Sequence, residues 1–380
     1  MKLHLLGLPH TITSSEHSHC AFTGKVKRFS PMMRGAGYEV VHYGVEGADS
    51  GANRQIDVLS REEWSELRER SRREKGLSAE SVRSFAGDLA DTDTALYRTF
   101  NERLREILVR EVRDERDLIC LPFGHAHDRA LKSERGRETL PNTKVETGIG
   151  YPTLVTSFRT FRVFESNAWL HWHLGRANRA PYDYDVVIPN YYDVSEWELG
   201  KGNGGYVLYM GRLDAIKGLE IVCEIARRRP DVCFRICGQG NPEPWLRSPN
   251  VFYHPPISGV ARSGLLGEAE AVLVPSRYVE PFAGVTVEAL LTGTPVLTSD
   301  FGAFTETVVE GRDGYRCRTI GDWLDGLDRI RGWSGERRLA IREAAKSRYD
   351  MHVLARSYDR FFRELDDLWT EGWNTERSHR

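Results

Sequence analysis

Two glutamates eight positions apart are the first candidates for ligand chemistry. Glu280 lies in a loop that follows the apolar run AVLVPS, and Glu288 lies in a helical stretch that we expect to begin at Pro281. Eight residues of helix span roughly 12 Å, so these carboxylates cannot hold one functional group but could hold two ends of an extended ligand. The spacing alone fits equally well with a capping glutamate followed by a solvated helical glutamate.

The start of that helix is built from small residues. The expected first turn is Phe282, Ala283, Gly284 and Val285. Small side chains at a helix start let backbone N–H groups approach an anion closely. This turn is therefore a candidate phosphate site.

Two further loops follow apolar runs. In YVLYMGRLDAIKGLE the run ends at Gly211, and Arg212 and Lys217 precede a helix expected from Leu219. Two cations beside a helix start suit a diphosphate, although an exposed basic loop is the commoner structure for such a segment taken alone.

The third loop, ICGQGNPEP, contains glycines at a sheet edge where open α/β folds bind ligands. Its glycines are Gly238 and Gly240. Neither GQG nor the sequence GNGG matches the dinucleotide fingerprint, which disfavours a nicotinamide-dependent oxidoreductase.

These loops require elements that hold them. Short β-like runs alternate with helical stretches, which predicts an α/β chain with parallel sheets covered by helices. In the first half we expect strands at Lys2–Leu8, Tyr38–Tyr43, Asp117–Pro122 and Asp185–Ile188, and helices over residues 61–116 broken near Gly76 and Gly87. In the second half the expected strands are YVLYMG, VCFRICG, VFYHPP, AVLVPS and TPVLTS, with a helix ending at Glu270 and closing helices at 334–349 and 352–370.

Composition excludes several classes of protein. With 380 residues, 40% of them hydrophobic, the chain can build two ordinary cores and is not a disordered protein. No apolar run approaches the ~20 residues of a membrane span, and the net charge of −2 gives no global basic field. Six cysteines without a CxxC pair are too few for a disulfide scaffold and favour a reducing cytoplasm. The opening MKLHLLGL imitates a short signal peptide, but a buried first strand is the better interpretation.

Taken in order, the second-half motifs resemble the nucleotide-sugar domain of GT-B glycosyltransferases, specifically the large retaining group called family 4. The motifs are IPNYYD, GRLDAIKG, GQG, the Glu280–Glu288 pair and GTPVLTSDFGAFTETV. The resemblance implies two Rossmann-like domains that face a central cleft. We expect a first domain over 1–192, a linker over 193–205, a second domain over 206–350, and residues 351–380 as a tail whose helix packs back towards the first domain.

The resemblance also implies roles for the candidate residues. Arg212 and Lys217 would bind the diphosphate of a UDP- or GDP-sugar, and amides near Gly284–Thr286 would touch its phosphates. Glu288 would hold the ribose hydroxyls and Glu280 hydroxyls of the transferred sugar, since carboxylates accept paired hydroxyl donors. On these roles, Glu280→Ala should leave binding of the free nucleotide nearly intact. No obligatory metal or other cofactor is expected.

The amino-terminal half departs from the common family pattern. The stretch PHTITSSEHSHCAFTGKVKRFSPMM replaces the usual glycine-rich loop and, with VETGIGYP and FRVFESNAWLHWH, resembles glycosyltransferases of bacteriophages and environmental bacteria. One suggested acceptor class is a hydroxymethylated DNA base. We also predict two basic loops, at residues 17–38 and 129–144, which would suit an anionic polymer as acceptor, although solvated loops are the commoner explanation. Their cations are Lys25, Lys27, Arg28, Arg34, Arg129, Lys132, Arg135, Arg137 and Lys144.

Histidines are concentrated in the first half. His125 and His127 follow the apolar run LICLPF, where the family often has an active-site histidine, and we treat both as catalytic candidates. Their i,i+2 spacing without a third ligand is a weak metal signal. Trp169 and Trp172 favour core packing over sugar stacking.

The sequence thus predicts a retaining glycosyltransferase that uses a nucleotide sugar, with a glycan, a natural product or a DNA base as acceptor. A nucleotide-sugar epimerase on the same fold and a non-catalytic nucleotide-sugar sensor are the alternatives.

Overall fold

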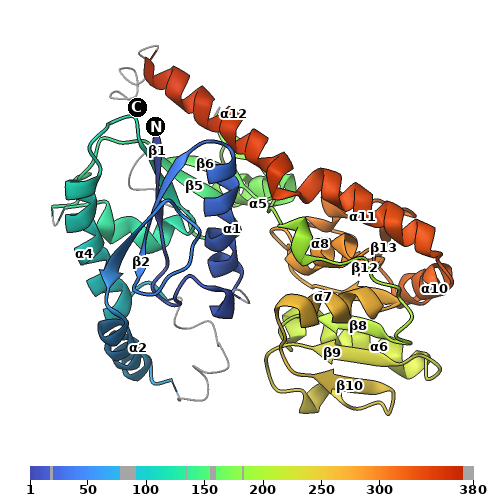
Figure 1. Cartoon of the computed structure of the whole chain (residues 1–380). Helices are drawn as coiled ribbons and strands as arrows, with labels where there is room; N and C mark the ends of the chain where they lie inside the picture. The colour runs from blue at the N-terminus through green and yellow to red at the C-terminus, as the bar shows by residue number, and fades with distance from the viewer. Residues whose placement is uncertain (18–19, 78–90, 134, 155–159, 182–183, 371–380) are drawn as a thin grey trace. The chain divides into compact units, whose positions relative to one another are not determined.

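The chain forms two compact units in a computed structural model that describes residues 1–17, 20–77, 91–133, 135–154, 160–181 and 184–370 (Figure 1). Unit 1 comprises Met1–Phe164, Pro181–Tyr191 and Met351–Arg380, and unit 2 comprises Glu165–Ala180 and Tyr192–Asp350. Each unit is built on one parallel sheet with helices on both faces. The predicted α/β class with two Rossmann-like units is therefore confirmed.

The boundaries of the units differ from the predicted ones at two places. Residues 165–180, expected in the first domain, group with unit 2, because helix α5 (Asn167–Ala177) is anchored there. Its first amides, those of Asn167 and Ala168, donate to the Glu306 carboxylate at 2.9 and 2.7 Å. A carboxylate at a helix N-terminus satisfies unpaired amides and the helix dipole together.

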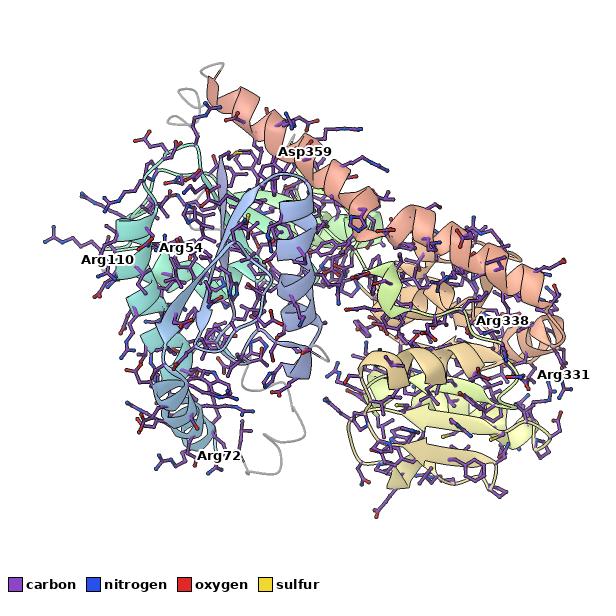
Figure 2. All side chains as sticks on the ribbon, in the orientation of Figure 1. Arg54, Arg72, Arg110, Arg331, Arg338 and Asp359 are labelled. Atoms are coloured by element: carbon purple, nitrogen blue, oxygen red, sulfur yellow. The ribbon has the colours of Figure 1, made fainter. Side chains whose placement is uncertain are left out.

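The second difference concerns the expected linker over 193–205, which packs onto unit 2. The amide of Gly200 donates to the Thr292 carbonyl at 2.9 Å, and that of Gly202 donates to the Gly267 carbonyl at 3.0 Å. Arg338, labelled in Figure 2, is buried and donates to the carbonyls of Gly200 and Gly267. Burial lowers the pKa of Arg338 to about 10. This segment is thus part of the domain rather than a tether.

The unit 1 sheet has seven parallel strands in the order β3-β2-β1-β4-β5-β6-β7. Four of them match predicted strands. The other three were missed because polar residues interrupt them: β3 carries Arg54 and Asp57, and the buried parts of β5 and β6 include Lys144, Glu146 and Arg162. The strands are β1 (Lys2–Leu6), β2 (Glu39–Val45), β3 (Arg54–Leu59), β4 (Leu118–Leu121), β5 (Lys144–Ile149), β6 (Thr160–Phe164) and β7 (Asp185–Val187).

Helices cover both faces of this sheet. Helix α1 (Ala21–Gly35) and helix α12 (Met351–Thr370) share one core with the sheet, and Figure 1 shows α12 as the long red helix. Helix α2 (Arg61–Glu74) and helix α4 (Ala95–Glu111) share the core on the other face. The helical prediction for residues 61–116 is confirmed over these two segments, and the break at Gly76 follows α2. Gly87 lies outside the described residues.

Helix α1 corrects the prediction of a basic loop. Val26, Phe29 and Met33 recur at helical spacing and are buried, so the segment contributes a core face. The loop was expected because the segment contains four cations, but the side chains of these cations bond to other parts of unit 1. Lys25 is 4% exposed and donates to the Gly148 carbonyl at 2.6 Å, while Arg28 donates to the Tyr191 carbonyl at 3.0 Å.

Most of the remaining cations of that prediction also have partners. Lys27 lies 3.3 Å from Asp49, and Arg34 donates to the Gly51 carbonyl at 2.8 Å. In the second stretch, Lys132 pairs with Asp128 at 2.9 Å and buried Lys144 pairs with Glu138 at 2.7 Å. Arg129 lies 3.5 Å from Asp93, and Arg135 and Arg137 are exposed. These residues therefore do not form an array of unpaired cations that could bind a polyanion.

The unit 2 sheet has six parallel strands in the order β10-β9-β8-β11-β12-β13. The first five strands along the chain match the predicted apolar runs. Three of them, β8, β11 and β12, are buried throughout and read as continuous apolar sequence, whereas the edge strand β10 exposes Phe252 and Tyr253. The last strand, GYRC, was not predicted. The strands are β8 (Val207–Met210), β9 (Phe234–Cys237), β10 (Val251–His254), β11 (Ala271–Val274), β12 (Val296–Ser299) and β13 (Gly314–Cys317).

Alternating side chains of these strands feed two cores. In β8, Leu208 and Met210 face one core, and Val207 and Tyr209 face the other. The first core includes helices α7 (Gly259–Glu268), α8 (Gly284–Leu291) and α11 (Gly335–Tyr349), together with Phe304 of the short helix α9 (Phe304–Thr307). The second includes α6 (Leu219–Arg228) and α10 (Ile320–Ile330). The sheet is thereby fixed between two helical layers, and its loops at the carboxyl edge are held in place.

Candidate functional site

The predicted donor residues gather in loops at the carboxyl edge of the unit 2 sheet. The loop after β8 is bonded to the loop after β9, since the amide of Leu213 donates to the Gln239 carbonyl at 2.7 Å. It is also bonded to the loop after β11, since the amide of Arg277 donates to the Ile216 carbonyl at 2.9 Å. Three loops separated in sequence thus form one connected surface.

Two glycines permit this close approach. A Cβ at Gly238 would lie 1.7 Å from the Gly211 carbonyl oxygen, and a Cβ at Gly218 would lie 1.9 Å from the Pro275 carbonyl oxygen. Gly218 also has φ +79°, a conformation that glycine adopts without strain. At Gly240, φ is +122° and a Cβ would meet Leu213. The glycines predicted as ligand contacts therefore have a structural role that places the loops.

The centre of this surface is a hydrogen-bonded cluster around Glu280. Lys217 Nζ lies 2.8 Å from Glu280 Oε1, and Ser276 Oγ donates to the same oxygen at 2.5 Å. Tyr278 OH donates to Oε2 at 2.5 Å and accepts a hydrogen bond from Lys217 Nζ at 2.6 Å. The two predicted residues Lys217 and Glu280 are thus brought together, and Ser276 and Tyr278 are functional candidates that the sequence analysis missed.

Burial makes this cluster electrostatically strong. Glu280 is 4% exposed, so its charge requires the three donors that it has. Burial, followed by the nearby Glu280 charge, raises the pKa of Tyr278 above its ordinary value, so this hydroxyl keeps its proton at neutral pH. An ammonium group has three N–H donors. Described residues accept two of those from Lys217, which leaves one for an anion.

Arg212 differs from Lys217 in its surroundings. Its side chain is 62% exposed and lies 4.0 Å from the Asp214 carboxylate. The backbone, in contrast, is fixed, because Tyr209 OH donates to the Arg212 carbonyl at 2.6 Å. The residue therefore has a rigid base and a side chain that is free to turn towards an anion at the sheet edge.

Helix α8 begins at Gly284, three residues later than predicted. Ala283 has a left-handed conformation with φ 60°, and Phe282 is buried against Tyr192 and Tyr349. The Thr286 amide donates to the Ala283 carbonyl at 2.9 Å, and its side chain is fully buried. Of the first three amides of α8, only those of Gly284 and Val285 have no hydrogen-bond acceptor among the described residues, so these two can bind an anion.

Glu288 is held by a partner that the sequence did not indicate. Arg262 donates to Glu288 Oε2 through Nε at 2.9 Å and through Nη2 at 2.5 Å. The two side chains are 28% and 16% exposed. Glu288 and Glu280 therefore belong to separate hydrogen-bonded clusters.

The two candidate histidines belong to unit 1 and have different environments. His125 is exposed, and its Nε2 lies 3.2 Å from Thr92 Oγ1. His127 is fully buried, and neither ring nitrogen has a hydrogen-bond partner among the described residues. Burial lowers the pKa of His127 to about 3, so its ring is neutral at pH 7.

We expect His127 to make unit 1 sensitive to acid. The pKa of His127 is about 3 in the folded chain and 6.5 when unperturbed. The unfolded chain therefore binds a proton first as the pH falls, so this residue lowers the free energy of unfolding progressively from pH 6.5 down to pH 3 and has no such effect above pH 6.5. At pH 5 this amounts to about 2 kcal/mol. Urea unfolding at pH 7 and pH 5 should therefore show a smaller loss in His127→Leu than in the wild type. His42, buried with a pKa lowered to about 4, contributes equally to both proteins. An equal loss in the two proteins would show that His127 is not buried as a neutral ring.

The tryptophan pair is packed rather than open. The Trp169 and Trp172 rings stack with centroids 4.4 Å apart, and His173 packs edge-on against both. The guanidinium of Arg176 lies 5.1 Å from the centre of the Trp172 ring. These contacts favour the predicted packing role over sugar stacking.

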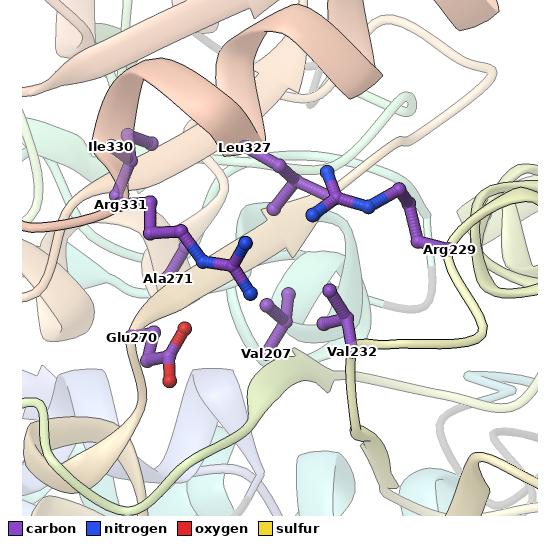
Figure 3. A pocket seen from close by; sticks show the side chains of 8 residues that line it. All are labelled: Val207, Arg229, Val232, Glu270, Ala271, Leu327, Ile330 and Arg331. Carbon is purple, nitrogen blue, oxygen red and sulfur yellow. The ribbon is translucent and has the colours of Figure 1, made fainter.

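A small pocket in unit 2 lies away from the predicted donor loops (Figure 3). Its lining includes Val207 and Ala271, the first residues of β8 and β11, so it opens at the amino edge of the sheet. Arg229, which borders it, is already paired with Asp231 and Asp328. Since ligands of open α/β sheets bind at the carboxyl edge, this pocket is not the candidate site.

Among the described residues, no group of three or more His, Cys, Asp or Glu side chains is placed to hold a metal ion. None of the helices in the described ranges combines the length and apolarity needed to cross a membrane.

Comparison with known proteins finds sequence similarity in the second half of the chain. Residues 194–348 match the family described as "Glycosyl transferases group 1". Glycogen synthase of Mycobacterium tuberculosis (strain CDC 1551 / Oshkosh) is 31% identical over 150 residues, which are 35% of this chain. The match spans 36% of the length of that curated relative.

Solved structures show the same fold over nearly the whole chain. AviGT4, a glycosyltransferase involved in avilamycin A biosynthesis, superposes with a TM-score of 0.66 at 17% identity, covering 97% of this chain and 98% of that one. Anabaena Alr3699/HepE, solved in complex with UDP and glucose, has a TM-score of 0.64 at 14% identity, covering 95% and 98%. Residues 194–348 are therefore similar in sequence to the group 1 glycosyl transferases, and the chain has the two-unit fold of AviGT4 and HepE.

Proposed function

We propose that this protein is a glycosyltransferase that moves a sugar from a nucleoside diphosphate sugar to an acceptor hydroxyl with retention of configuration. The observation that carries the proposal is the Lys217–Glu280 cluster at the carboxyl edge of a domain similar to the group 1 glycosyl transferases. There Lys217 has an unused N–H donor for an anion. The adjacent Glu280 carboxylate accepts three hydrogen bonds of the about four that it can accept, so its Oε2 can also accept one from a sugar hydroxyl. The UDP and glucose bound to HepE are ligands of the same chemical class.

In the proposed reaction, the bond between the anomeric carbon and the diphosphate oxygen breaks, and a bond from that carbon to the acceptor oxygen forms. The acceptor proton passes to the departing diphosphate. Lys217, Arg212 and the amides of Gly284 and Val285 would stabilise the negative charge that develops on the leaving group. Glu280 already accepts three hydrogen bonds, which suits a residue that orients hydroxyls better than a covalent nucleophile.

The proposed division of roles assigns Glu288 to the ribose and Glu280 to the transferred sugar. Gly238 and Gly240 would bring backbone close to the donor, whose base is uracil or guanine. Of the two histidines we propose His125 for acceptor contact, because its ring is the exposed one. A cytoplasmic location stays a prediction from the six unpaired cysteines.

We propose a hydroxymethylated DNA base as the acceptor, and a glycan or natural-product hydroxyl is the competing class. The support for DNA is the resemblance of the amino-terminal motifs to those of bacteriophage glycosyltransferases. The cations of helix α1 do not add to it, because they are bonded within unit 1.

Mass spectrometry of products tests the proposal. A panel of UDP- and GDP-sugars is offered with hydroxymethylated DNA, simple glycans or no acceptor. Transfer predicts an acceptor heavier by one sugar together with free nucleoside diphosphate. Conversion of the donor without any acceptor would indicate an epimerase instead, and binding without turnover would indicate a sensor.

A further inference from the structure

The ion pair between helices α7 and α8 has an uneven geometry. Both bonds from Arg262 end on one oxygen of Glu288, Oε2. The other oxygen, Oε1, accepts no hydrogen bond from any residue in the described ranges. A carboxylate oxygen can accept two hydrogen bonds, so Oε1 has the capacity to hold a vicinal pair of hydroxyls.

The position of Oε1 relates it to the phosphate end of the site. A Cβ at Gly284 would lie 3.9 Å from Oε1, so this oxygen faces the first turn of α8. The unused amides of Gly284 and Val285 lie in that same turn. A ribose joined to a phosphate at this turn would therefore have its hydroxyls within reach of Oε1.

Arg262 is suited to fix this orientation. Its guanidinium is planar and presents donors in a rigid fork, so two bonds to one oxygen restrict rotation of the carboxylate more than one ammonium bond would. The pair is mostly removed from water, with Arg262 28% and Glu288 16% exposed, so solvent weakens it less than an exposed pair.

We propose that Arg262 is a positioning residue that makes the donor site selective for ribonucleotides. By holding Oε2, it keeps Oε1 turned towards the 2′- and 3′-hydroxyls of the nucleoside, so that a deoxynucleotide loses this interaction. The inference rests on the proposed function, in which Glu288 receives the ribose.

Calorimetry with ribo- and deoxyribonucleoside diphosphates tests the role. UDP and GDP are first compared on the wild type, and the tighter ligand is then measured against its 2′-deoxy form. We expect the wild type to prefer the ribonucleotide by about 10-fold, the scale of one charge-assisted hydrogen bond. Arg262→Ala should weaken ribonucleotide binding to the level of the deoxy form, and Arg262→Lys should restore part of the preference.

A matched control separates positioning from general destabilisation. Arg227 forms a more exposed pair with Glu224 within α6, so Arg227→Ala removes an Arg–Glu contact and should leave the preference unchanged. A preference that persists in folded Arg262→Ala, or one that increases because Arg262 had competed with the ribose, would overturn the inference. If the wild type binds neither UDP nor GDP, the proposed function fails. Nucleotide binding without any ribose preference would overturn the inference and leave the proposed function standing.

Discussion

Lys217→Ala should slow sugar transfer by about 10²- to 10³-fold, the cost of losing one charged donor to a developing anion. The effect is expected to be large because Lys217 is fixed before any ligand arrives. Its Nζ is held by Tyr278 OH at 2.6 Å and Glu280 at 2.8 Å, so little reorganisation is needed when charge develops on the diphosphate. Nucleoside diphosphate binding should also weaken.

Initial transfer rates and calorimetry on the same variant check this expectation. Lys346→Ala is the matched control, because Lys346 pairs with Glu343 at 2.9 Å on an exposed face of α11 and should change neither quantity. Unchanged rate and affinity in Lys217→Ala would remove Lys217 from the site.

Glu280→Ala should lower both the transfer rate and the affinity for the free nucleotide, the rate by about 10²-fold or more. The sequence alone led us to expect nearly intact nucleotide binding, on the reasoning that Glu280 touches only the sugar. The structure changes that expectation. Lys217 and Tyr278 both depend on the Glu280 carboxylate, and its removal releases the cation that would meet the diphosphate.

Glu280→Gln separates the two contributions of this residue. The amide keeps an oxygen for Lys217 and roughly the same volume, so nucleotide affinity should fall less than in Glu280→Ala, while the rate stays low. Calorimetry of both variants beside transfer assays measures the difference. Equal and unchanged nucleotide affinity in the two variants would show that Glu280 does not position Lys217.

The fold was predictable where burial is complete on both sides of a strand. Strands β8, β11 and β12 of unit 2 appear as short apolar runs because every residue in them is buried between two helical layers. In unit 1, β5 and β6 were missed because Lys144, Glu146 and Arg162 are buried there in polar contacts, which sequence patterns read as surface. Helix α1 was missed because Pro31 and several cations interrupt the apolar periodicity of its sequence.

The site was predictable residue by residue but not as a cluster. Lys217 and Glu280 each follow a strand that ends at the same sheet edge, which the motifs indicate. Their direct pairing joins positions 63 apart in sequence and had no local signal. Tyr278 could have been considered from its place two residues before Glu280. Arg262 had no signal, since its role depends on how α7 packs against α8.

The most direct test of the central claim is a calorimetric comparison of nucleoside diphosphates with their monophosphates. The claim is that the loops at the carboxyl edge of the unit 2 sheet bind the diphosphate of a nucleotide sugar through Lys217. We predict that UDP or GDP binds at least about 10-fold more tightly than UMP or GMP, and that Lys217→Ala removes most of this difference. No nucleotide binding, or equal affinity for the diphosphates and monophosphates in the wild type, would contradict the account.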